Sequence, residues 1–164
     1  NVNEIKINTK DNWKHKFFKT LDQSYKKYPF HSQIIPTIEQ LVFNEEQNLS
    51  KYNINTIKVI LDHLEIDSKK LRLSSELKQE GSSNQLLINL TKSLSCDIYM
   101  CGGGADGYQK KELFEKSNVK LLHQEFVHPK YNQQKQQEFV KGLSIIDCLM
   151  NIGWEETSYI IKND

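Results

Sequence analysis

Three adjacent glycines, Gly102, Gly103 and Gly104, are the residues of this sequence best suited to bind a small molecule. They follow the apolar run of residues 97–101 and precede a segment with helical periodicity. Glycine lacks a Cβ, so the backbone can take positive φ and a ligand can approach the main chain. A following helix would direct unpaired N–H groups at an anion or polar oxygen. The alternative is a tight strand-to-helix turn without a ligand.

A second interpretation of the same loop is a dinucleotide site. Gly102, Gly104 and Gly107 satisfy the G-x-G-x-x-G spacing, and Glu125 lies about where a ribose-binding acid would stand. However, too few residues follow Glu125 for the further strands of a full dinucleotide fold. Dinucleotide binding therefore stays the lesser alternative.

Histidines and serines near the predicted strand ends are the candidates for acid–base or nucleophilic chemistry. Ser74 and Ser75 follow a short predicted strand, but no G-x-S-x-G motif surrounds them. His123 and His128 would lie on opposite faces of an extended strand, which argues against a shared metal. His128, just past the strand end, is the better candidate for a general base. The alternative is a loop histidine without a chemical role.

Composition limits the partners. The 164 residues carry a formal net charge of +1, and Arg72 is the one arginine, so we expect no nucleic-acid partner. No apolar run approaches the length of a membrane span, and we expect no signal peptide. Three cysteines without metal-ligand spacing favour a reducing, cytoplasmic setting and predict no metal site. The sequence indicates no particular cofactor.

Periodicity predicts an α/β fold in a single domain of residues 1–164. Residues 9–66 form a helical part with three helices, which begin after Asp11 or Asn12, after Ser32 and after Ser50. Residues 143–162 form C-terminal helices. There, Ser144 and Asp147 fit a capping box, and Gly153 ends the first helix.

Between these helical parts, residues 69–128 alternate strand and helix. Strands at 70–73, 97–101 and 119–127 with two intervening helices give a parallel β-α-β-α-β order. Ligands gather at the carboxyl ends of such strands. The residues expected to line one cleft there are Ser74, Ser75, Asp106, Tyr108 and His128.

The order of these motifs resembles the WbqC-like family of bacterial surface-polysaccharide gene clusters. The motifs that carry the resemblance are Trp13 with Tyr25 and Pro29; residues 74–77; residues 99–102 with Gly104 and Tyr108; residues 128–131 with Gln133 and Phe139; and residues 143–147 with Asn151 and Gly153. One departure concerns Cys101, which stands where a serine is common in the family and so weakens a nucleophile argument there.

The resemblance implies a role in O-antigen or related glycan assembly, with transfer of an acyl or aminoacyl group to an amino sugar. The implied partner is a nucleotide-sugar or another small-molecule substrate, and Tyr131 and Gln133 join the expected substrate-binding residues. The sequence leaves open whether the protein is an enzyme. The rival hypothesis is a non-catalytic, partner-binding module of the same pathway.

The N-terminus is where the chain departs most from the family pattern. Residues 1–8, with alternating polar and apolar side chains, look like the tail of a missing segment rich in Pro, Trp, Tyr and acidic residues. We therefore expect a fragment of a longer protein whose missing part completes the site. An opening edge strand without a partner would also invite pairing with a second copy, as a homodimer.

Overall fold

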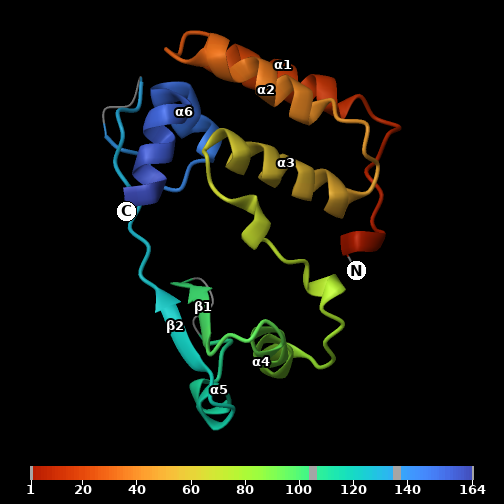
Figure 1. Cartoon of the computed structure of the whole chain (residues 1–164). Coiled ribbons are helices and arrows are strands. Elements are labelled where there is room, and N and C mark those ends of the chain that lie inside the picture. The colour runs from red at the N-terminus through yellow and green to blue at the C-terminus, as the bar shows by residue number, and fades with distance from the viewer. Residues whose placement is uncertain (1, 104–106, 135–137, 164) are drawn as a thin grey trace. The chain divides into compact units, whose positions relative to one another are not determined.

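The computed structural model describes residues 2–103, 107–134 and 138–163, which form two compact units. One unit comprises residues 1–68 and 128–164, and the other comprises residues 69–127. The first unit contains η1 (Val2–Glu4), α1 (Trp13–Tyr25), α2 (His31–Val42), α3 (Leu49–His63) and α6 (Ile145–Asn163). The second contains η3 (Ser74–Glu76), α4 (Ser83–Ser93), β1 (Ile98–Gly102), α5 (Lys111–Lys116) and β2 (Lys120–Gln124), with η2 (Ser68–Lys70) at the junction (Figure 1).

Helix packing builds the core of the first unit. Helices α1 and α2 lie side by side, and α2 also packs against α6 (Figure 1). The buried apolar residues at their interface are Leu21, Ile34, Ile38, Val42, Leu64, Leu149 and Met150. The cap of helix α3 lies two residues before the expected Ser50, because it is the side chain of Asn48 that accepts the Lys51 backbone N–H, at 3.0 Å.

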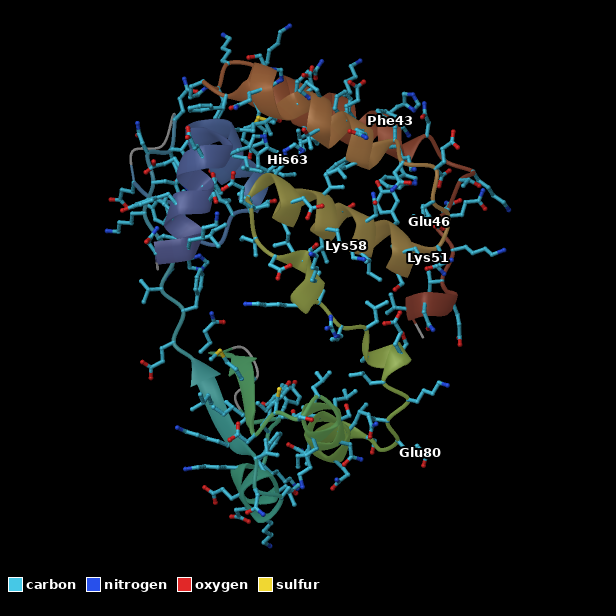
Figure 2. All side chains as sticks on the ribbon, in the orientation of Figure 1. Phe43, Glu46, Lys51, Lys58, His63 and Glu80 are labelled. Atoms are coloured by element: carbon cyan, nitrogen blue, oxygen red, sulfur yellow. The ribbon has the colours of Figure 1, made fainter. Side chains whose placement is uncertain are left out.

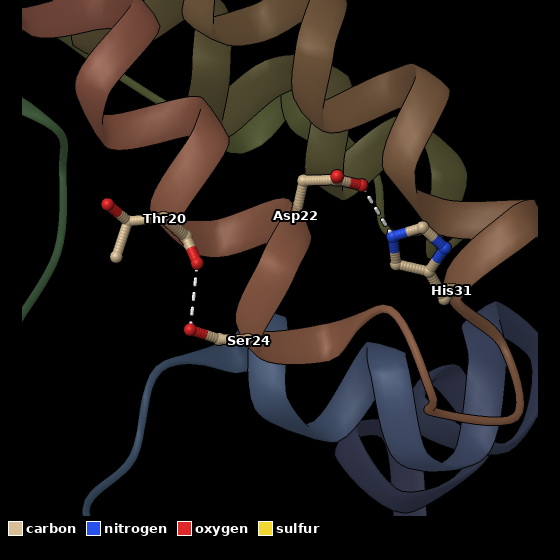
Figure 3. Close-up of polar contacts among 4 residues, drawn as sticks. All are labelled: Thr20, Asp22, Ser24 and His31. Atoms are coloured by element: carbon tan, nitrogen blue, oxygen red, sulfur yellow. Dashed lines mark hydrogen bonds and ion pairs between the residues drawn. The ribbon is translucent and has the colours of Figure 1, made fainter.

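A polar link fixes the connection between α1 and α2. His31 Nε2 lies 2.8 Å from Asp22 Oδ1, so the first residue of α2 is tied to the last turns of α1 (Figure 3). In the same turns, Ser24 Oγ donates to the Thr20 carbonyl at 2.7 Å. Helix α2 therefore begins at His31, ahead of the Ser32 cap expected from sequence.

The N-terminal segment pairs within its own chain. The expected edge strand is reduced to η1 followed by one antiparallel bridge between Lys6 and Asn48. Ile7 N–H donates to the Gln47 carbonyl at 2.8 Å, and Leu49 N–H donates to the Ile5 carbonyl at 2.9 Å. The expectation of an unpartnered opening strand was therefore wrong, and these contacts lend no support to dimerisation through it.

Helix α6 bends sharply at Gly153, the residue expected to end a helix. Its φ of 76° and ψ of −179° lie in a region accessible essentially to glycine alone. The ring of Phe30 packs over this position, and a Cβ there would lie 2.6 Å from Phe30 Cδ1. Phe30 N–H also donates to the Met150 carbonyl at 3.2 Å. The kink thus lets α6 pass beneath the turn that precedes α2.

The sheet of the second unit is smaller than predicted. In the described residues it has two parallel strands, β1 and β2, connected through α5. Phe114 of α5, Ile88 of α4 and Val119 form its buried core, on which Tyr99 and Leu121 pack. Strand β2 stops at Gln124 because β1 ends opposite it at Gly102, so Phe126 and Val127 are exposed.

The predicted strand at 70–73 was wrong, and with it the β-α-β-α-β order. Here the chain forms η2 and η3 instead. Arg72 folds back on its own segment, donating from Nη1 to the carbonyls of Lys69 and Leu71. Leu71 is exposed, so this segment lacks the buried face that a core strand needs. In the described ranges, no helix is both long and apolar enough to cross a membrane.

Candidate functional site

The glycine segment stands at the carboxyl end of β1, as expected. In the parallel ladder, Gly102 pairs with Gln124. Among the described residues, leaving aside the two chain neighbours of Gly102, no heavy atom lies within 4 Å of the place where its Cβ would stand, so the main chain is open to these residues there. Gly103 does not have positive φ, and its Cβ would meet only the Gln124 carbonyl at 3.9 Å. The expectation that Gly103 or Gly104 needs positive φ or a close backbone approach stays a prediction, because Gly104 lies outside the described residues.

A thiol and an imidazole face each other beside these glycines. Cys101 pairs in register with His123, and Cys101 Sγ lies 3.4 Å from His123 Nδ1. Cys101 is buried and His123 is exposed. From the sequence, His123 was considered only together with His128, as a possible metal ligand. The pairing of His123 with Cys101 was not predicted. The signal available in the sequence was a cysteine at the end of one predicted strand, 97–101, and a histidine within the next, 119–127.

Buried Asn84 anchors the chain that leaves the glycine loop. Its Nδ2 donates to the Tyr108 carbonyl at 3.2 Å, and its Oδ1 accepts the Lys110 N–H at 2.9 Å. The Tyr108 side chain is itself exposed. Gln109 Oε1 is buried and finds no hydrogen-bond partner among the described residues. A buried acceptor of this kind needs a donor from water or a ligand.

The other residues expected at the strand ends have different settings. Ser74 and Ser75 are exposed and form η3, so they do not follow a strand. Asp106 lies outside the described residues. His128 is exposed in the first unit, whereas the serines belong to the second. Their common cleft stays a prediction.

A buried carboxylate organises a second polar cluster, in the first unit. Asp147 Oδ1 accepts the Tyr25 hydroxyl at 3.1 Å, and Oδ2 accepts the Tyr131 hydroxyl at 2.7 Å. Asn151 Nδ2 donates to Oδ2 at 3.2 Å. Ser144 acts as the cap of α6, since its Oγ accepts the Ile146 N–H at 3.3 Å. Asp147, expected to complete a capping box, instead holds the two tyrosines.

Gln133 and Tyr131 extend this cluster toward the surface. Gln133 exchanges two hydrogen bonds with the backbone of Val140, at 2.8 and 2.9 Å, and also donates to the Tyr131 hydroxyl at 3.1 Å. A hollow of about 420 Å³ lies beside it, lined by Lys27, Pro29, Asn132, Gln133, Gln134 and Asn151. The side-chain oxygen and nitrogen of Gln133 therefore both hydrogen-bond within the protein, and the residue also lines the hollow.

Burial and the Asp147 carboxylate make both tyrosines weaker acids. Burial, followed by the charge of Asp147, raises the pKa of Tyr25 to about 12. Burial also raises the pKa of Tyr131, and the hydrogen bond to Asp147 adds to the shift. Each phenol therefore stays protonated as a donor to Asp147 through the neutral range.

This arrangement predicts an alkaline loss of stability. The folded state holds the Tyr25 proton more tightly than the unfolded chain, so its stabilisation is complete below about pH 10 and is lost as pH rises through about 12. Tyr25→Phe should make the decline of the unfolding free energy over that window shallower, as measured by denaturant titration. Tyr159→Phe, at an exposed position, is the control. Equal slopes for Tyr25→Phe and the unaltered protein would contradict the assignment.

An aromatic platform marks another hollow of the first unit. His63 lies at the end of α3 (Figure 2). Its ring stacks on that of Trp154, on α6, with the centroids 4.5 Å apart. A hollow of about 520 Å³ beside them includes Glu65, Glu155 and Tyr159 in its lining. Within the described ranges, no three His, Cys, Asp or Glu side chains are grouped as metal ligands would be.

Comparison with known protein families identifies the family of this chain. Residues 1–159 match the WbqC-like protein family. The chain belongs to this family. The match covers the glycine segment, the Cys101–His123 pair and the Asp147 cluster together. It therefore agrees with the resemblance that the motif order indicates.

Similar curated proteins are distant in sequence. The chain is 24% identical over 151 residues to the uncharacterized protein Rv1507c of Mycobacterium tuberculosis. The match covers 90% of this chain and 64% of that relative, so the chain spans less than two thirds of the relative's length. It is 26% identical over 133 residues to ribosomal RNA large subunit methyltransferase H of Mycoplasmopsis agalactiae, covering 79% of this chain and 86% of that protein. No solved structure matches the chain significantly.

Proposed function

We propose that this WbqC-like protein takes part in bacterial surface-polysaccharide assembly, in which it transfers an acyl or aminoacyl group to an amino sugar carried by a nucleotide. The single observation that carries this is the open main chain at Gly102, next to a thiol–imidazole pair at the carboxyl ends of two parallel strands. That edge is where ligands bind in parallel sheets. Acyl transfer needs a nucleophile or a base at such a place.

The proposed substrate-binding residues fall into two sets. Around the glycine segment they are Ser74, Ser75, Gly102, Gly103, Gly104, Asp106 and Tyr108. In the first unit they are Tyr131 and Gln133, with His128 as a proposed general base. The hollow beside Gln133 supports a polar ligand there. The free thiols of Cys96, Cys101 and Cys148 support a reducing, cytoplasmic location.

A ligand screen tests this function. A compound that binds only the folded protein raises its stability, by about 2.7 kcal/mol at a hundred times its dissociation constant. We expect uridine diphosphate glucosamine and acetyl-coenzyme A each to raise the melting temperature. A shift with S-adenosylmethionine alone would contradict acyl transfer and favour the chemistry named for the methyltransferase relative. Absence of a shift with any nucleotide-sugar, acyl or aminoacyl donor would favour a partner-binding module.

A variant of the glycine segment sharpens the screen. Gly102→Val should leave the melting temperature of the free protein nearly unchanged, because no described residue other than its chain neighbours lies within 4 Å of the new Cβ and a strand tolerates a β-branched residue. It should abolish the ligand shift by blocking the main chain. Ile98→Val, at the far end of the same strand, is the matched control and should keep the shift. A Gly102→Val protein that responds like the control would show that ligand binds elsewhere.

A further inference from the structure

We infer that Cys101 is a nucleophile and His123 its base, and that the acyl group travels from donor to acceptor as a thioester on Cys101. This rests on the proposed acyl transfer, and it assigns the proton transfers of that reaction to His123 in place of His128. The thiol sulfur and the Nδ1 of the imidazole lie 3.4 Å apart. That is within reach of a hydrogen bond to sulfur, which proton transfer between them requires.

Regular secondary structure holds the pair in place. Cys101 and His123 are register partners in the parallel ladder, so backbone hydrogen bonds between β1 and β2 determine their separation. Two residues earlier on each strand, Tyr99 and Leu121 share the same face and pack on the buried Phe114 core. The pair therefore extends a packed face and does not depend on a loop for its geometry.

Cys101 and His123 differ in their exposure to solvent, and the difference suits the proposed reaction. Cys101 is 7% exposed, so little water competes for an acyl group bound to it. His123 is exposed and can exchange the proton it takes from the thiol.

The reaction balances without any redox partner. His123 takes the Cys101 proton while sulfur attacks the carbonyl carbon of an acyl thioester; the donor's thiol leaves with that proton, and the acyl group stays on sulfur. The sugar amine then attacks the thioester, the new amide bond forms, and the carbon–sulfur bond breaks. His123 passes the proton lost by the amine to the Cys101 sulfur, which restores the thiol.

The other cysteines serve as internal references. Cys96 is exposed, and its Sγ lies 3.5 Å from the Leu94 carbonyl. Cys148 contacts the Thr157 hydroxyl at 3.4 Å, and burial raises the pKa of its thiol. Among the described residues, neither of these two thiols has a hydrogen bond to a histidine. Accessibility alone would make Cys96 the most reactive of the three.

Alkylation with iodoacetamide at about pH 7, followed by peptide mass spectrometry, tests the pair. We expect Cys101 to react about tenfold faster than Cys96 despite its burial, and His123→Gln to remove that advantage without changing the Cys96 rate. Far-UV circular dichroism verifies that the variant is folded. Cys101 reacting no faster than Cys96, or at an unchanged rate in folded His123→Gln, would overturn the proposal.

Acylation by acetyl-coenzyme A separates this proposal from the proposed function. We expect a hydroxylamine-sensitive acetyl group on Cys101 that uridine diphosphate glucosamine discharges. Acetylated sugar formed equally well by folded Cys101→Ala would overturn the nucleophile while the function stands. A Cys101 thioester that the sugar does not discharge would support the pair and contradict the proposed acceptor.

Discussion

Replacing Gly153 by alanine should cost the first unit about 4 kcal/mol of unfolding free energy, the sum of backbone strain and a steric clash. The φ of 76° strains any L-residue, and the new Cβ would lie 2.6 Å from the Phe30 ring, well inside van der Waals contact. Urea unfolding followed by tryptophan fluorescence measures this loss. Trp13 and Trp154 are the two tryptophans, and both belong to this unit.

Gly142→Ala separates strain from clash. Gly142 has a φ of 79°, but nothing lies within 4 Å of its Cβ position, so we expect a loss of about 1–2 kcal/mol. Adding Phe30→Ala to Gly153→Ala should cost less than the sum of the two single changes because the clash is removed. A Gly153→Ala protein that loses no more stability than Gly142→Ala would contradict the packing of Phe30 on α6.

Removing the carboxylate of Asp147 should destabilise the first unit by about 3 kcal/mol, because the hydroxyls of Tyr25 and Tyr131 lose their acceptor in a buried setting. Asp147→Asn, which keeps one acceptor oxygen, should lose about half as much. The same fluorescence titration measures both. Asp62→Ala, at an exposed position on α3, should change stability by less than about 0.5 kcal/mol. If Asp147→Ala lost no more stability than Asp62→Ala, the polar cluster around Asp147 would be accessible to water, which contradicts the account.

Local patterns predicted the helices well because their causes are local. The four-residue spacing of Trp13, Phe17, Leu21 and Tyr25 predicts α1. The positive φ of Gly153 agrees with its position at the end of an apolar run. The predicted strand at 70–73 failed because a short apolar alternation does not show whether a partner strand exists. There, Arg72 bonds to nearby carbonyls and the segment stays on the surface.

The candidate site depended on long-range pairing, which single-sequence patterns do not show. Cys101 and His123 become neighbours only through the register of β1 and β2. Tyr25 reaches Asp147 across 122 residues of sequence, so a capping box inside one helix was the simpler interpretation of that carboxylate. The glycine segment was found because glycine clusters after an apolar run are a local signal.

Detection of the reaction product tests the central claim most directly. The unaltered protein is incubated with uridine diphosphate glucosamine and a panel of acyl-coenzyme A and aminoacyl donors. The molecular mass of the nucleotide-sugar is then measured by mass spectrometry. We predict that at least one donor adds its acyl group to the sugar amine and that Gly102→Val abolishes this while Ile98→Val does not. A nucleotide-sugar that keeps its mass with every donor, while the protein remains folded, would contradict acyl transfer.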